Sequence, residues 1–427
     1  MLSWTEDPAA TRTFTWQDSA GVSRAWLRWG RTPLSEAGRT EAAVVASGAG
    51  RVRFEATARG LSPGSEYYYS LGAEETGWSA PVSFTTAPAL PDSFSFLFLG
   101  DINPAAVSEY DDWGLLLAEA AERSPDLAFA LLGGDMVESG RPEEWDGFLT
   151  NAAPVFSRLP LLSVNGNHES NYIGGKPLEY LNIFALPRNG PPGFEEEFYS
   201  FDYGPAHIIV LNSHVYSGEQ NLSEAELTAL SEWIRQDLAA SPAVWKIAAF
   251  HHPAYALARD TVSDGVRANW APLLEAGGVQ LALVGHQHVY SRSRPLTDGA
   301  ADYENGVVYI MGNSGLKFYT TADESFSERI VYGAANYQVV SLSAEALTAT
   351  TFAAGGAELD AVTLAARGPS GPGRADVSGD GRADFQDMWL VEEAILAGQA
   401  AAELDVNGDG TVDILDAQAA YLGGSGS

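Results

Sequence analysis

The chain has 427 residues, no cysteine and a formal net charge of −32, from 56 acidic and 24 basic residues. The missing cysteines exclude disulfides, thiolate metal sites and cysteine nucleophiles, and the acid excess argues against binding nucleic acid or an anionic membrane through a basic surface. No run approaches the roughly 18 apolar residues of a membrane-spanning helix, and no signal peptide is recognisable.

The amino-terminal region, residues 1–88, alternates apolar and polar residues at short spacing. Strands are predicted at 12–17, 24–29, 51–58 and 67–71. Turn-forming segments rich in Gly, Ala, Ser and Pro separate them. Several short strands at this rhythm predict a small β-sandwich.

The middle region, residues 92–366, alternates predicted strands with predicted helices at 113–123, 223–239 and 264–274. Ser223 and Glu226 form a capping box at the start of the second helix. Asp264 is the predicted N-cap of the third helix, which Pro272 interrupts. This alternation predicts an α/β core of packed layers. Residues 367–373, rich in Gly and Pro, form a predicted linker.

Five polar segments in this region each follow an apolar run at 94–99, 127–132, 161–164, 244–250 or 279–284. The segments are Gly100-Asp101-Ile102-Asn103, Gly134-Asp135, Gly166-Asn167-His168-Glu169, His251-His252-Pro253 and Gly285-His286-Gln287-His288. Short apolar runs bounded by turn residues indicate buried strands. The polar segments would therefore lie at the carboxyl ends of strands, where α/β sheets bind ligands.

The residue types in these segments indicate a metal centre. Carboxylate and amide oxygens with neutral imidazoles suit two cations about 3.5–4 Å apart, which activate water and hold a phosphoryl group. The ligand set suits iron, zinc or manganese alike. His207, inside a predicted strand at 207–211, is interpreted as structural, and Lys317 is a weaker candidate for phosphate contact.

The carboxyl-terminal region, residues 374–427, contains a repeated 12-residue loop, at 376–387 and 29 positions later at 405–416. Each loop has oxygen ligands at positions 1, 3, 5, 9 and 12, glycine at position 6 and a backbone carbonyl at position 7, which is the ligand schedule of a calcium loop. The predicted calcium-binding residues are Asp376, Ser378, Asp380, Arg382, Asp384, Asp387, Asp405, Asn407, Asp409, Thr411, Asp413 and Asp416. A helical stretch follows each loop, from Met388 and from Ala417, so this region is predicted to be a small α-helical domain that binds two Ca²⁺.

The five-segment set resembles the metallophosphoesterase superfamily, and residues 4–366 most resemble the purple acid phosphatases and their bacterial relatives. The resemblance implies a fibronectin-like first domain and a two-sheet catalytic sandwich. It implies that Asp101 and His288 bind the first metal, that Asp135 bridges both metals, and that Asn167, His251 and His286 bind the second metal. His168 would act beside the substrate as the catalytic histidine.

The chain departs from the purple acid phosphatases at the first metal. Glu138 stands where purple members have the tyrosine that gives their colour, so we expect a colourless protein. Asn103 stands where many superfamily members have a histidine, and the first metal would take Asn103 or water. No histidine follows in 255–285, where plant members have two. The general acid is therefore open among His168, His252 and His214.

Residues 374–422 resemble a type I dockerin, which implies binding to a cohesin domain of a scaffoldin, as in a cellulosome, and an extracellular location. The function predicted is a secreted dinuclear-metal phosphoesterase acting on phosphomonoesters. One alternative is a phosphodiesterase or nucleotidase with the same site. Another is a non-catalytic binding component whose first-metal site has decayed.

Overall fold

The computed structural model describes residues 1–367, apart from 34, 49, 74–75, 170–175 and 321–324, together with 389–391 and 394–395. The two predicted calcium loops, at 376–387 and 405–416, lie outside the described residues, as does most of the linker predicted at 367–373. The prediction of a calcium-binding domain therefore rests on the sequence.

Two antiparallel sheets form the amino-terminal β-sandwich. One has the order β1 (Leu2–Ser3), β2 (Thr11–Ser19), β6 (Arg51–Arg59) and β5 (Ala43–Gly48). The other has the order β4 (Gly38–Glu41), β3 (Trp26–Gly30), β7 (Glu66–Ala73) and β8 (Gly77–Trp78), with β9 (Val82–Thr85) also paired to β7. The buried aromatic rings of Phe14, Tyr69 and Phe84 contact one another between the sheets. The predicted sandwich is confirmed, although the short strands β1, β4, β5, β8 and β9 were not predicted.

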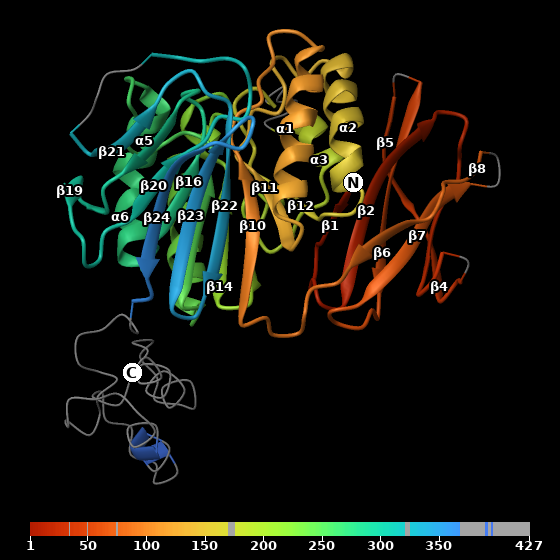
Figure 1. Ribbon diagram of the computed structural model, residues 1–427, viewed down its shortest axis with the longest axis horizontal. Helices are drawn as coiled ribbons and strands as arrows, with labels where there is room; N and C mark the ends of the chain where they lie inside the picture. The colour runs from red at the N-terminus through yellow and green to blue at the C-terminus, as the bar shows by residue number, and fades with distance from the viewer. Residues whose placement is uncertain are drawn as a thin grey trace.

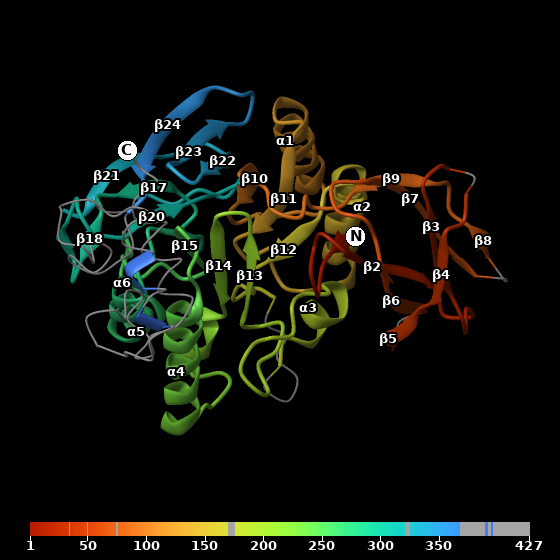
Figure 2. The same cartoon turned by 90° about the horizontal axis from the view of Figure 1, so that it is seen from below.

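The central region contains two larger sheets packed face to face, with helices on their outer sides (Figures 1 and 2). The six-stranded sheet has the order β12 (Leu161–Ser163), β11 (Leu127–Leu132), β10 (Ser93–Leu99), β22 (Asn336–Ser343), β23 (Ala346–Ala353) and β24 (Glu358–Ala365). The seven-stranded sheet has the order β13 (Tyr199–Tyr203), β14 (Ala206–Leu211), β15 (Trp245–Phe250), β16 (Leu281–Val284), β20 (Val308–Met311), β17 (Tyr290–Ser293) and β21 (Ser327–Val331). The predicted α/β core of packed layers is confirmed.

Helices cover both sheets. The six-stranded sheet is covered by α1 (Glu109–Arg123) and α2 (Pro142–Phe156), with α3 (Leu178–Ile183) nearby, and the seven-stranded sheet by α4 (Glu224–Ala240), α5 (Thr261–Asn269) and α6 (Ala271–Ala276) (Figure 2). One apolar core includes residues of both sheets, α1 and α2, and a second lies between the seven-stranded sheet and α4–α6. The chain also forms the short helix η1 (Ser213–Tyr216) and a small hairpin of β18 (Leu296–Thr297) and β19 (Ala300–Ala301). Strands covered on both faces, such as β15 and β16, are almost fully buried and read as continuous apolar runs. The strands β23 and β24 instead alternate, with every second residue less buried.

The helix starts show where local sequence rules held and where they failed. At α4 the capping box is present, since Ser223 Oγ accepts the N–H of Glu226 and Glu226 accepts the N–H of Ser223. The prediction of one helix at 264–274 capped by Asp264 was wrong. Asp260 caps α5, and α6 begins after Trp270 with Pro272 in its first turn. Proline has no N–H to donate to the preceding turn, so it starts a new helix more readily than it continues one.

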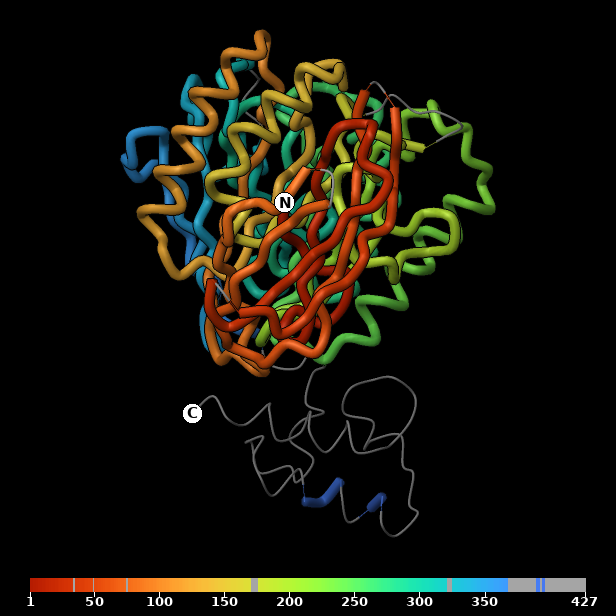
Figure 3. Tube along the Cα trace, turned by 90° about the vertical axis from the view of Figure 1, so that its right-hand side faces the viewer, coloured from red at the N-terminus to blue at the C-terminus, as the bar shows by residue number. Residues whose placement is uncertain are grey.

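The amino-terminal sandwich packs directly against the central region. Trp4 stacks edge-on against Phe129 and Phe201, with ring centroids 5.4 Å apart in both pairs. The Ser3 hydroxyl donates to the carbonyl of Ala185 over 2.6 Å, and the Tyr69 hydroxyl donates to the carbonyl of Ser157 over 3.0 Å. Figure 3 views this arrangement from the sandwich side, with the layers of the central region behind the sandwich strands. The buried contacts of Trp4 indicate that the two regions fold against each other.

Candidate metal centre

The candidate ligands come from strand ends in both sheets. In the six-stranded sheet β10, β11 and β12 run parallel and are followed by Asp101, Asp135 and Asn167. In the seven-stranded sheet β15 and β16 run parallel and are followed by His251 and by His286 with His288. Since the two sheets pack face to face, their carboxyl ends bring these loops to one place.

Three of the predicted ligand side chains converge on one point. Asn167 Oδ1 lies 3.0 Å from His251 Nε2 and 3.0 Å from His286 Nδ1. His251 Nδ1 lies 2.9 Å from the carbonyl oxygen of Gly133, which can only accept, so the proton of the neutral ring belongs on Nδ1. This leaves the lone pair of His251 Nε2 directed toward Asn167 Oδ1, so that both atoms could bind the same metal ion.

Asp101, Asp135 and His288 form the other half of the cluster. Asp101 and Asp135 are buried with His251, and one ligand atom from each of the three lies within 4.8 Å of the others. The Asp101 carboxylate accepts the N–H of His286 over 2.8–2.9 Å, and Asp135 Oδ1 accepts the N–H of His168 over 3.0 Å. His288 Nδ1 is buried without a hydrogen bond among the described residues, and so is Asp135 Oδ2, whose close polar neighbour is His251 Nε2 at 3.2 Å. Buried orphan ligand atoms of this kind fit a bound cation.

The electrostatics of the cluster also favour a cation. Burial lowers the pKa of His251, but Asp135 and Asp101 outweigh it and raise the pKa to about 10. Two buried carboxylates thus attract positive charge to this position. Burial lowers the pKa of His288, which favours the neutral, ligating imidazole. The donor set, burial and charge together fit two metal ions.

The backbone at the site is strained. Asn103, Asp135, His286 and His288 adopt positive φ values of 33°, 54°, 78° and 47°. Non-glycine residues rarely occupy this region, and such strain concentrates at functional sites. Gly166 is required by close packing, because a Cβ there would lie 2.3 Å from the Asp135 carboxylate.

Glu169 holds two of the ligand loops together, a role that we did not predict. Its buried carboxylate accepts the N–H groups of Asp135, Met136 and Gly166 over 2.7–2.8 Å, and that of Val137 over 3.3 Å. The sequence contained one indication of a role for Glu169, because this residue directly follows His168 in one of the five polar segments. A buried carboxylate surrounded by backbone donors fixes the chain around Asp135.

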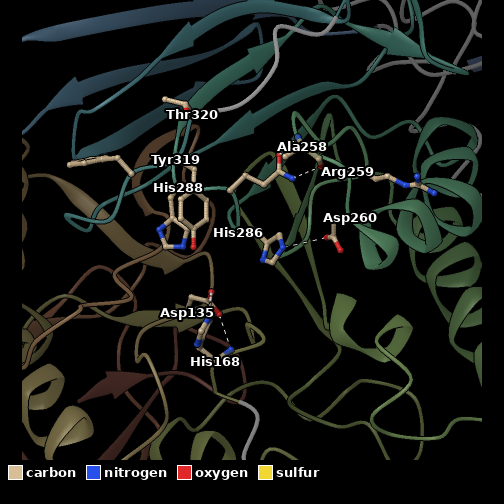
Figure 4. A pocket seen from close by; sticks show the side chains of 11 residues that line it. Asp135, His168, Ala258, Arg259, Asp260, His286, His288, Tyr319 and Thr320 are labelled. Atoms are coloured by element: carbon tan, nitrogen blue, oxygen red, sulfur yellow. Dashed lines mark hydrogen bonds and ion pairs between the residues drawn. The ribbon is translucent and has the colours of Figure 1, made fainter.

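A cavity of about 530 Å³ opens over the cluster. Asp135, His168, His286 and His288 line it, and the segments 258–260 and 318–320 form its rim (Figure 4). His168 Nδ1 bonds the carbonyl of Glu138, while Nε2 lies 3.9 Å from Asp135 Oδ2. Its side chain is 27% exposed. His168 therefore reaches the cavity beside the cluster, where a proton could pass to a bound ligand.

The two departures from the family at the first metal meet at a lysine. Lys317 Nζ donates to Asn103 Oδ1 over 2.7 Å and to Glu138 Oε2 over 3.2 Å. Burial lowers the pKa of Lys317, but hydrogen bonds and charge attraction from Glu138 and Tyr319 together outweigh it and the net shift is upward, so the ammonium keeps its charge. Asn103 and Glu138 are therefore held by an ammonium group in this structure.

Two candidate histidines remain, and one of them, His252, offers a ring nitrogen within 4.8 Å of ring nitrogens of His251 and His286. His252 is buried, with Nδ1 2.9 Å from Ser213 Oγ and its ring centroid 4.2 Å from that of His286. His214 is buried, with Nε2 3.1 Å from Glu219 Oε2. Neither lines the cavity over the cluster. His168 is thus the histidine outside the ligand set that the structure places at the cavity.

Comparison with known families agrees with this geometry. Residues 94–290 match the calcineurin-like phosphoesterase family, residues 1–86 the purple acid phosphatase N-terminal domain, and residues 374–420 the dockerin type I domain. Together these three matches extend over most of the chain. No helix among the described residues is long and apolar enough to cross a membrane.

Individual relatives are distant. Purple acid phosphatase 18 of Arabidopsis thaliana is 24% identical over 316 residues, which cover 70% of this chain and 68% of the relative. Human acid phosphatase type 7 is 29% identical over 267 residues, which cover 56% of each chain. The structure of a purple acid phosphatase from yellow lupin (Lupinus luteus) seeds superposes with a TM-score of 0.70 at 18% identity, covering 86% of this chain and 74% of the lupin chain. The chain thus spans between about half and two thirds of the two curated relatives, and the lupin structure shares its fold.

Proposed function

Because the chain is a purple acid phosphatase-like metallophosphoesterase with a type I dockerin domain, we propose that it hydrolyses phosphomonoesters at a dinuclear metal centre. The observation that carries the proposal is the convergence of six ligand side chains from five strand ends beneath one cavity. These are Asp101, Asp135, Asn167, His251, His286 and His288. Two bound metals would supply the nucleophilic water and neutralise phosphoryl charge.

The protein's own groups divide the remaining work. Asp135 Oδ2 lies 3.2 Å from His251 Nε2, and Asp135 Oδ1 accepts the backbone N–H of His168. The hydrogen bond of His168 Nδ1 to the Glu138 carbonyl leaves Nε2 facing the cavity. In the proposed reaction the imidazolium form of His168, which carries a proton on each ring nitrogen, donates the Nε2 proton to the leaving-group oxygen or a hydrogen bond to the phosphoryl oxygens.

Elemental analysis combined with a small ester panel tests this function. The purified protein is expected to contain about two transition metals besides calcium and to cleave an aryl phosphate faster than its bis-aryl diester. Asp135→Asn should lower metal content and activity together. His168→Ala should keep the metals and reduce kcat by about 10²–10⁴.

Each alternative has its own outcome. Faster cleavage of the diester would favour a phosphodiesterase. A protein with fewer than two transition metals and no turnover would favour a non-catalytic binding component. The contacts of Lys317 with Asn103 and Glu138 are the observation that supports the second alternative, because both residues are altered from the family at the first metal.

The dockerin match supports a second part of the proposal: the enzyme acts outside the cell, tethered through calcium-loaded residues 374–420 to a cohesin domain. Capture of the full chain by an immobilised cohesin should require calcium and be reversed by a calcium chelator. Absence of capture by cohesins of the type I class would contradict the tether and leave the hydrolase proposal standing.

A further inference from the structure

Asp260 occupies a fixed position at the start of helix α5. Its carboxylate accepts the N–H of Val262 over 3.1 Å and that of Ser263 over 3.3 Å, and the hydroxyl of Ser263 over 2.8 Å. These bonds satisfy backbone donors that the first turn of a helix leaves without partners. Only 18% of the Asp260 side chain is exposed. The cap therefore holds the carboxylate in one place at the cavity rim.

The same carboxylate faces the candidate ligand His286. Asp260 Oδ2 lies 3.3 Å from His286 Nε2 (Figure 4). On the other side of the ring, His286 Nδ1 lies 3.0 Å from Asn167 Oδ1. The two ring nitrogens thus have opposite surroundings, a carboxylate on one side and a metal-ligand oxygen on the other. A neutral imidazole has a single N–H, and a carboxylate can only accept. The proton belongs on Nε2, and the lone pair of Nδ1 is left for a metal.

We propose that Asp260 is a positioning residue for the second metal: it orients the His286 ring and selects the tautomer that ligates through Nδ1. The inference rests on the proposed dinuclear function. Carboxylate partners on the outer nitrogen of a ligating histidine fix its orientation and raise its basicity.

The surroundings of His286 explain why such a partner is needed. His286 has a φ of 78°, and its backbone N–H is held by Asp101, but these contacts do not fix the rotation of its ring. The centroid of the His252 ring lies 4.2 Å from that of the His286 ring, so a second imidazole is close enough to compete for the same metal. Without Asp260 the His286 ring would lose the contact that distinguishes its two nitrogens.

Substitutions at Asp260 can separate the cap from the histidine contact. Asp260→Ser retains a good N-cap residue, but the shorter hydroxyl loses the reach to His286. Asp260→Asn retains both the cap and a neutral acceptor. Ser263→Ala is the matched control, since it removes a hydrogen bond to Asp260 and leaves the histidine contact intact. Asp260→Thr also caps helices and replaces the serine variant if that variant does not fold.

The test is a zinc titration of the full-length protein against a competing chelator, with calcium in excess to saturate the dockerin. In Asp260→Ser, the affinity of one of the two zinc sites should fall by about 10–100-fold, with a smaller loss in Asp260→Asn and none in Ser263→Ala. The ¹⁵N spectrum of zinc-loaded wild-type protein should show His286 protonated on Nε2, and the serine variant should lose this single pattern.

The outcomes distinguish the two proposals. Wild-type protein that binds no zinc outside the dockerin would overturn the dinuclear function itself. Wild-type protein that binds two zinc ions, together with a folded Asp260→Ser variant of unchanged affinity, would overturn the role of Asp260 alone. A spectrum with zinc on His286 Nε2 would overturn it as well.

Discussion

His207 is a buried histidine held between two aspartates, and it offers a test of the electrostatics away from the metal centre. In strand β14, its Nδ1 lies 2.8 Å from Asp202 Oδ1 and its Nε2 2.8 Å from Asp237 Oδ2. Burial lowers the pKa of His207, but the two carboxylates outweigh it and raise the pKa to about 9. Ser200 Oγ donates to Asp237, and Lys246 is the cross-strand neighbour of His207.

The consequence is a stability that depends on pH. The folded pKa of about 9 exceeds the ordinary value of 6.5, so His207 stabilises the fold fully below pH 6.5 and loses this effect as pH rises through 9. A shift of this size corresponds to about 3 kcal/mol at most. Asp202 is 75% exposed, and solvent screening of its share leaves on the order of 2 kcal/mol.

Urea unfolding of the wild type and of His207→Gln between pH 6 and pH 10 measures the effect. The difference in unfolding free energy between the two proteins should shrink by about 2 kcal/mol over this range, because the subtraction cancels groups that both share. Asp237→Asn should remove more of this drop than Asp202→Asn, since Asp237 is the more buried partner. A difference that stays constant with pH would refute the assigned charge on His207.

Three further substitutions probe the site and the domain contact. Glu169→Gln leaves two of four backbone N–H groups without an acceptor whichever way its amide turns. We therefore expect the free energy of unfolding in urea to fall by about 2–4 kcal/mol and the metal content to fall as well. The exposed substitution Glu143→Gln is the control, and full metal retention in Glu169→Gln would contradict the role of Glu169. Lys317→Met removes an ammonium group that contacts Asn103 and Glu138 near the proposed first metal, and it should raise zinc affinity at that position by about three- to tenfold. Unchanged zinc affinity would show that the charge of Lys317 does not act on the metal. Arg12→Met replaces a buried guanidinium whose Nε and Nη1 have no hydrogen-bond partner among the described residues, and burial lowers the pKa of this group to about 10. The substitution should raise the free energy of unfolding by about 1–2 kcal/mol. A lower free energy of unfolding would show that the contacts of Arg12 with Trp4 and Phe84 outweigh the cost of the buried charge.

The sequence was informative wherever a local pattern had one physical meaning. Apolar runs followed at once by Asp, Asn or His predicted both the strands and the side of the sheets on which the candidate ligands meet. The capping box of Ser223 likewise predicted the start of α4, because both halves of the motif lie within four residues.

Other features depended on contacts that no local pattern encodes. Asp260 and Asp264 are equally good capping residues, and only the packing of α5 beside His286 decides for Asp260. Lys317 meets Asn103 across 214 positions of sequence, so the pairing of an altered ligand position with an ammonium required the fold. The positive φ values at Asp135 and His288 could not be predicted from residue type, because Asp and His adopt them more often than most residues but still in a small minority of cases.

These non-local contacts explain how the ligand loops keep a strained geometry. Glu169 binds the backbone of the Asp135 loop, Asp101 binds the backbone of His286, and Asp260 contacts the ring of His286. Each contact comes from a carboxylate in a different loop, so strain in one loop is opposed by hydrogen bonds from another. A metal entering such a site meets ligand atoms that already converge, and little of its binding free energy goes into ordering the chain. The same arrangement makes the cluster cooperative, because loss of one carboxylate releases the backbone that positions the next ligand.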